Sequence, residues 1–108
     1  MRVFKGPIDF SRAHFHGDVS FIGMRFLNSA NFTRSTFHGE PWFHNVTFSQ
    51  KVNFTYAKFL KDTWFENSTY TKGADFDDST FSRVARFENA KFFEDTSFRR
   101  IKFLVYFI

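Results

Sequence analysis

The feature that most constrains this chain is an aromatic residue that returns every five or six positions along almost its whole length. From Phe4 onward the steps alternate between six and five residues without a break, giving a basic period of eleven. A helix cannot hold this phase, because its apolar face recurs about every 3.6 residues. The pattern predicts a coiling chain of short extended segments and regular corners, with these aromatic residues inside: Phe4, Phe10, Phe15, Phe21, Phe26, Phe32, Phe37, Phe43, Phe48, Phe54, Phe59, Phe65, Tyr70, Phe76, Phe81, Phe87, Phe92, Phe98 and Phe103.

A second register lies two residues before each aromatic position. From Ile8 to Ile101 none of its members is charged, and most are small, as in Ala30, Ser68 and Ala74. Residues two apart in an extended segment point to the same side. Each unit therefore places one small and one aromatic side chain inside, and the residue between them outside.

The outward positions set the length of one coil. Residues of similar chemistry recur every 22 positions rather than every 11, as in the series Asp9, Asn31, Asn53 and Asp75 and the separate series Gly23, Asn45, Asn67 and Asn89. A coil of about 22 residues contains four units and therefore has four sides. Asn and Gly tolerate left-handed turn geometry, so the second series is expected at one corner. The prediction is one all-β domain spanning residues 1–108.

The stretches "ANFTRSTF", "ADFDDSTF" and "ARFENAKF" resemble the units of pentapeptide-repeat proteins, in which a small residue stands two places before a central Leu or Phe. The resemblance covers essentially the whole chain and implies a right-handed quadrilateral β-helix (a solenoid) with four aromatic rings per layer. The sequence departs from the pattern by its near-constant Phe and by a sixth residue in every second unit. That extra residue is expected to widen two of the four corners.

Composition limits the functional classes. The chain has no cysteine and a net charge of +4. No apolar run approaches the roughly 20 residues of a spanning helix, and the first twenty residues contain no apolar core of a signal peptide. A cytoplasmic location is therefore expected, with membrane association as an alternative if the chain is part of a longer protein. Some pentapeptide-repeat proteins mimic duplex DNA and bind type II topoisomerases through an acidic surface. This basic chain is not expected to do so.

Residues for catalysis or metal binding do not stand out. His16 and His38 share one phase in "FHGD" and "FHGE", and only Asp18 or Glu40 offers a third ligand within those motifs. We interpret the pair as a repeated corner sequence. No catalytic group, cofactor or metal ion is predicted, and the chain is not expected to be an enzyme.

The most informative exceptions are Trp42 and Trp64, which take outward positions one coil apart on one side. Their rings are expected to stack at about 5 Å, the spacing between strands. Tyr56 is a further exposed aromatic residue on an adjoining side. Exposed Trp residues can mark a partner contact surface, but the pattern somewhat favours the alternative, cross-coil stacking that stabilises the ladder.

These observations favour a non-catalytic scaffold that mediates protein–protein interaction with an unidentified partner. The alternative is weak electrostatic binding to nucleic acid or to an anionic membrane surface. Arg12, Arg34 and Arg100 share one phase and mark a basic corner that could make such contacts.

After the last repeat the sequence continues with apolar residues rather than a polar cap, and the final coil is predicted to be incomplete. Three interpretations remain open: an end-to-end homodimer, a following segment of a longer protein, or a tail folded over the open coil. The residues concerned are Leu104, Val105, Tyr106, Phe107 and Ile108.

Overall fold

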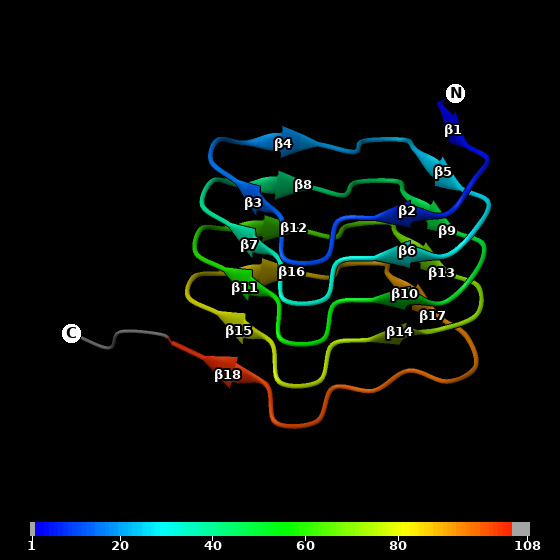
Figure 1. Cartoon of the computed structure of the whole chain (residues 1–108). Coiled ribbons are helices and arrows are strands. Elements are labelled where there is room, and N and C mark those ends of the chain that lie inside the picture. Colours follow the sequence, from blue (N-terminus) through cyan, green and yellow to red (C-terminus); the bar gives the residue numbers. More distant parts are fainter. Residues whose placement is uncertain (1, 105–108) are drawn as a thin grey trace.

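A computed structural model describes residues 2–104 as a right-handed solenoid whose four sides are parallel β-sheets (Figure 1). Every strand is two residues long, and there is no helix among these residues. Within each sheet a strand pairs with the strand 22 residues further along, as in Phe4 with Phe26 and Phe37 with Phe59. The predicted four-sided coil of about 22 residues is therefore confirmed.

Two of the four sides are five-stranded sheets. The sheet called here the β1 face consists of β1 (Val3–Phe4), β5 (Arg25–Phe26), β9 (Thr47–Phe48), β13 (Thr69–Tyr70) and β17 (Lys91–Phe92). The β3 face consists of β3 (His14–Phe15), β7 (Thr36–Phe37), β11 (Lys58–Phe59), β15 (Thr80–Phe81) and β18 (Lys102–Phe103).

The other two sides are four-stranded sheets that alternate with the first two around the coil. The β2 face consists of β2 (Ile8–Asp9), β6 (Ala30–Asn31), β10 (Val52–Asn53) and β14 (Ala74–Asp75), and a bridge from Asp75 to Ser97 extends it. The β4 face consists of β4 (Val19–Ser20), β8 (Pro41–Trp42), β12 (Thr63–Trp64) and β16 (Ala85–Arg86).

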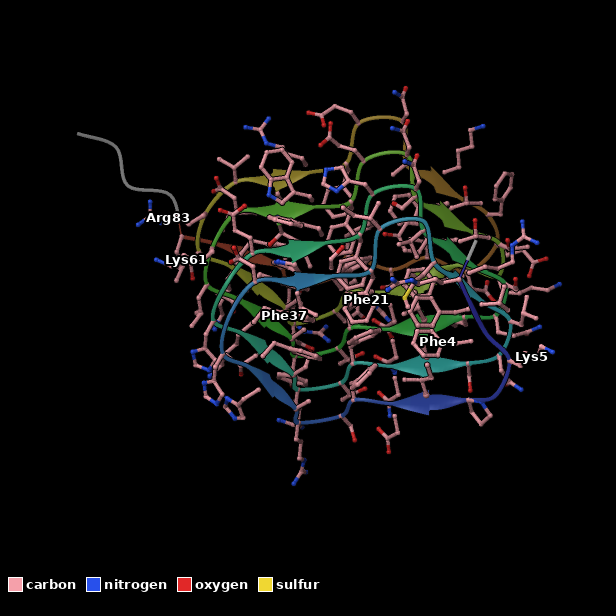
Figure 2. The ribbon with its side chains drawn as sticks, turned by 90° about the horizontal axis from the view of Figure 1, so that it is seen from above. Phe4, Lys5, Phe21, Phe37, Lys61 and Arg83 are labelled. Atoms are coloured by element: carbon pink, nitrogen blue, oxygen red, sulfur yellow. The ribbon has the colours of Figure 1, made fainter. Side chains whose placement is uncertain are left out.

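The core is a set of four columns of stacked rings, one column behind each face. Phe54 is fully buried and stacks on Phe32 and Phe76, with ring centroids 4.9 Å away on either side. Figure 2, viewed along the solenoid, shows Phe21 and Phe37 pointing inward and Lys5 and Lys61 pointing outward. Stacking within a column and edge-on contacts between columns give each ring a favourable aromatic geometry.

Tyr70 fits a different column, between Phe48 and Phe92, because its hydroxyl group has a polar neighbour. Its hydroxyl oxygen lies 3.1 Å from Ser68 Oγ, which donates a hydrogen bond to the carbonyl oxygen of Phe65. Burial raises the pKa of Tyr70, so the phenol stays protonated and can donate to Ser68.

The corners are of two kinds, as the alternating spacing predicts. At the five-residue corners the backbone closes a tight turn with a left-handed residue, as at Arg12 (φ 60°), Gly23 (φ 71°) and Asn45 (φ 57°). On the β2 face, Asn31 Oδ1 accepts a hydrogen bond from the backbone N–H of Thr33, and the same bond recurs one coil on from Thr55 to Asn53. These local bonds explain the Asp and Asn residues of that face.

The prediction that every repeated aromatic residue is buried is wrong at both ends of the described solenoid, since Phe4, Phe10 and Phe15 are half-buried and the last two rings are exposed. The exposed fraction of Phe98 is 44% and that of Phe103 is 61%, whereas Phe76 and Phe81 one coil earlier are buried. The phase of these residues is inward, but a ring in an outermost coil has a stacked neighbour on one side only. Among residues 2–104, no helix is long and apolar enough to cross a membrane.

Candidate contact surfaces

The β4 face carries the two tryptophans. Trp42 and Trp64 are paired residues of β8 and β12, so they lie side by side on adjacent coils, as predicted. The same outward position holds Ser20 on the coil before Trp42 and Arg86 on the coil after Trp64. Both indoles are half-buried rather than fully exposed.

The expected stacking of one indole on the other is not what holds this pair. Trp64 Nε1 donates a 2.7 Å hydrogen bond to Glu40 Oε1, and Trp42 Nε1 lies 3.4 Å from the same oxygen. The ring of Trp64 stacks on His44, 5.6 Å between centroids, and the Arg86 guanidinium lies 4.7 Å from the Trp64 ring. A carboxylate, an imidazole and a guanidinium therefore fix the indole of Trp64.

Two polar atoms of this surface have no hydrogen-bond partner among the described residues. They are Nδ1 of His44 and Nε of Arg86, and both are shielded from solvent. The other ring nitrogen of His44 lies 3.3 Å from Glu66. Buried polar atoms without a hydrogen-bond partner cost free energy. The β4 face carries two such atoms next to its tryptophans.

Tyr56 lies elsewhere. Its exposed fraction is 45%, and it occupies a left-handed position (φ 58°) at the corner between the β2 and β3 faces. The Arg34 guanidinium lies 4.5 Å from the centre of the Tyr56 ring. The β3 face separates this corner from the tryptophans, so the structure does not bring the three predicted contact residues into one surface.

The predicted basic corner is largely engaged within the molecule. Arg34 covers Tyr56, and Arg100 makes a two-pronged ion pair with Asp78, at 2.7 and 3.0 Å. The hydrogen bond from Arg100 holds the pKa of Asp78 below its usual value. Arg12 remains exposed, so this corner does not present three free positive charges as the sequence suggested.

The side chain of Asp77, the residue directly before Asp78, is buried although its position in the repeat points outward. Ser97 Oγ donates a hydrogen bond to Asp77 Oδ1, and the backbone N–H of Arg99 donates to the same oxygen at 2.8 Å. The bond from Ser97 is the main cause that lowers the pKa of Asp77, against the opposing effect of burial. This network ties the last two described coils together.

A second group of cations lies on the β3 face and its neighbouring corner. Lys58 and Lys102 flank Thr80 on adjacent coils, and no salt bridge of these lysines, or of Lys61 and Arg83 at the corner, is found in residues 2–104. Figure 2 shows Lys61 and Arg83 on the same outer edge, away from the core ring of Phe37. The sequence analysis did not single out this group, because its members occupy two different phases of the repeat.

The predicted dimer end is only partly visible. Leu104 is exposed next to the exposed ring of Phe103. The other four residues of that prediction, Val105, Tyr106, Phe107 and Ile108, lie outside the described part of the chain. The dimer therefore stays a prediction.

Comparison with protein families agrees with this geometry. The family model described as "Pentapeptide repeats (9 copies)" matches residues 3–47 and 32–80, which together span well over half of the chain. The chain belongs to the pentapeptide-repeat family. Comparisons with curated proteins and with solved structures gave no match.

Membership of the pentapeptide-repeat family accounts for the inward residues and the corners, since these define the repeat. It does not account for the outward residues, which vary from coil to coil. The repeat pattern therefore does not determine the residue type at Trp42, Trp64, Glu40 and Arg86. Sequence reasoning singled out the two tryptophans as contact residues but not Glu40 or Arg86. Their positions could have indicated them, because Glu40 stands two residues before Trp42 and Arg86 stands one coil after Trp64.

Proposed function

We propose that this pentapeptide-repeat chain is a non-catalytic scaffold that presents its β4 face to a protein partner. The observation that carries the proposal is the in-register pair of Trp42 and Trp64, held by the shared carboxylate of Glu40. Trp and Arg are the residue types most enriched among those that dominate binding energy at protein interfaces. Here both types occupy neighbouring outward positions of one sheet.

The rigidity of the solenoid supports the same role. Each outward position of the β4 face is fixed by backbone hydrogen bonds to the next coil, as from Phe43 N to the carbonyl oxygen of Trp64 at 2.7 Å. A preorganised surface loses little conformational entropy on binding.

Affinity capture from the lysate of the source cells tests this proposal. The baits are the wild-type chain, the Trp42→Thr variant and a Lys58→Thr control on the β3 face. A partner of the β4 face is retained by the wild type and the control and lost by Trp42→Thr. Retention of the same proteins by all three baits would show that the β4 face is not the contact surface.

A second candidate is electrostatic binding to a polyanion, favoured by the cations Lys58, Lys61, Arg83 and Lys102. Retention on immobilised duplex DNA and on vesicles containing anionic lipid, measured against salt, tests it. Counterion release predicts affinity that falls steeply with salt and falls again in a Lys58→Thr, Lys102→Thr variant. No retention at low salt would exclude this candidate.

The end-to-end homodimer is tested separately. Sedimentation velocity over a range of concentrations distinguishes monomer from dimer, and a Leu104→Lys change should abolish a dimer formed through this end. A monomer at tens of micromolar would argue against the dimer.

A further inference from the structure

Three of the four histidines come together at one edge of the β3 face. His14 lies in β3, His16 directly follows that strand on the other side of Phe15, and His38 directly follows β7 on the next coil. The centroids of the three rings lie 5.9, 5.3 and 5.0 Å apart for His14–His16, His14–His38 and His16–His38. Sequence analysis compared only residues of the same phase and therefore missed His14.

We propose that His14, His16 and His38 form a binding site for a divalent transition-metal ion of the zinc class. The Nδ1 atom of His14 lies 3.0 Å from Nε2 of His38. Two nitrogens bound at about 2.0–2.1 Å to one tetrahedral zinc ion are separated by about 3.4 Å. A small opening of the existing pair therefore places both nitrogens at the distance that one ion requires.

The hydrogen bond between these two rings shows that a lone pair already faces the neighbouring ring. In a bond between two neutral imidazoles, one nitrogen donates its proton and the other accepts with its lone pair. When a metal ion binds both nitrogens, the donating ring carries its proton on its other ring nitrogen instead, so both imidazoles stay neutral and each offers a lone pair to the ion. The third imidazole, that of His16, lies against both rings on the same outer surface.

The described conformation is not yet a closed site, because no three His, Asp or Glu side chains in residues 2–104 converge on a single point. The change needed is confined to side chains. His14 and His16 are exposed and His38 is half-buried, so their rings can turn without displacing core residues.

The backbone under the three rings is held firmly. Phe15 and Phe37 stack at 4.7 Å and 4°, and the N–H of His38 donates a 2.9 Å hydrogen bond to the carbonyl oxygen of Phe15. A metal site is more specific when its ligands project from rigid elements, as these do. Figure 1 shows β3 and β7 side by side at the same edge of the solenoid.

The corner directly after His16 and His38 brings the two coils very close together. It is formed by Gly17 and Gly39, and a Cβ atom on Gly39 would lie 2.4 Å from the carbonyl carbon of Gly17. Only glycine allows the two coils to approach this closely at that corner.

The carboxylates that the sequence offered as a third ligand are engaged elsewhere. Asp18 Oδ1 accepts a hydrogen bond from the backbone N–H of Glu40, and Glu40 Oε1 accepts the bond from Trp64. The ligand set is therefore three imidazoles. Three neutral ligands suit zinc, nickel or copper rather than magnesium or calcium, and leave a fourth position for water or for a ligand from a binding partner.

Metal titration of the chain without a histidine tag tests the proposal. The probes are Zn²⁺ alone, followed by calorimetry, and Co²⁺ alone, followed by its visible absorption. We expect one ion per chain, and each of His14→Ala, His16→Ala and His38→Ala should weaken binding by at least about tenfold. The matched control is His44→Ala, which removes the histidine outside the cluster and should leave metal affinity unchanged.

Circular dichroism of each variant verifies that the solenoid is folded, which is expected because the three rings lie outside the core. The proposal is overturned if the wild type binds no Zn²⁺ at millimolar concentration. It is also overturned if His14→Ala binds as tightly as the wild type, or if His44→Ala weakens binding as much as the other three changes.

Discussion

The indole N–H of Trp64 donates a 2.7 Å hydrogen bond to the carboxylate of Glu40, a residue 24 positions earlier on the preceding coil. This bond joins two adjacent coils through side chains on the outer surface, beyond the backbone ladder. It also makes the carboxylate of Glu40 the common neighbour of both tryptophans, since Trp42 Nε1 lies 3.4 Å from the same oxygen.

Removing that carboxylate should release the Trp64 ring. We expect Glu40→Ala to lower the free energy of unfolding by about 1–2 kcal/mol, because a half-buried N–H loses a charged acceptor. Tryptophan fluorescence of the folded variant should also shift to longer wavelength as the indoles gain contact with water. Urea denaturation of Glu40→Ala beside Glu88→Ala, an exposed glutamate on the same side, gives the comparison; equal stabilities would mean that the bond contributes nothing.

A larger loss of stability is expected from a substitution in the core. Phe54→Ala should cost about 3–5 kcal/mol of stability, because the rings of Phe32 and Phe76 are held by their own coils and cannot close the cavity. Thr55→Ala, one residue on and outside the core, should cost less than about 1 kcal/mol. If chemical denaturation gave similar losses for the two variants, the inward assignment of Phe54 would be wrong.

The left-handed corners contain residues that do not favour this conformation. Arg12 has φ 60° and is exposed, and its side chain has no hydrogen bond or ion pair among the described residues. Arg12→Asn should stabilise the chain by about 0.5–1 kcal/mol, because asparagine adopts left-handed geometry at lower cost than arginine. Thermal melting is compared with Arg25→Asn, which lies on a regular strand and should gain nothing; a loss of stability in Arg12→Asn would contradict the expectation.

Acid should loosen the contact between the last two described coils. The hydrogen bond from Ser97 lowers the pKa of Asp77 from its ordinary value of 3.8, so the ionised form stabilises the fold. That contribution is present above the ordinary value and is lost as the pH falls through the lower pKa of the folded state. The wild type should therefore lose more stability than Asp77→Asn between about pH 5 and about pH 2.

Denaturation midpoints of the wild type and of Asp77→Asn, measured across this pH range, test the prediction for Asp77. Asp95→Asn changes an exposed aspartate in the last described coil and should keep the wild-type acid profile. Parallel profiles for the wild type and Asp77→Asn would show that Asp77 does not carry the effect.

Most of the fold could be predicted from the sequence, because the repeat fixes which side chains face inward. The phase of Phe54, the corner at Asn45 and the pairing of Trp42 with Trp64 all follow from counting residues. The exposure of Phe103 could not be predicted by counting residues, because an inward phase does not guarantee that a further coil covers the ring.

The candidate site was less predictable. The phase of Glu40 places it at a corner, but the rotamer that brings its carboxylate to Trp64 depends on three-dimensional contacts between coils. The same holds for Arg34, whose guanidinium covers Tyr56 instead of forming a basic surface. Outward side chains lack the packing constraints that determine the core, so their partners appear only in the structure.

The most direct test of the proposed scaffold is the affinity of the captured partner for the purified wild-type, Trp42→Thr and Lys58→Thr chains, measured by calorimetry. A half-buried tryptophan at the centre of an interface contributes about 2 kcal/mol or more, so Trp42→Thr should weaken binding by at least about thirtyfold. Its stability should fall by less than about 1 kcal/mol, since its one hydrogen bond is long. Lys58→Thr should bind like the wild type. Unchanged affinity in Trp42→Thr, or a loss of binding that is as large in Lys58→Thr, would contradict the assignment of the β4 face as the partner surface.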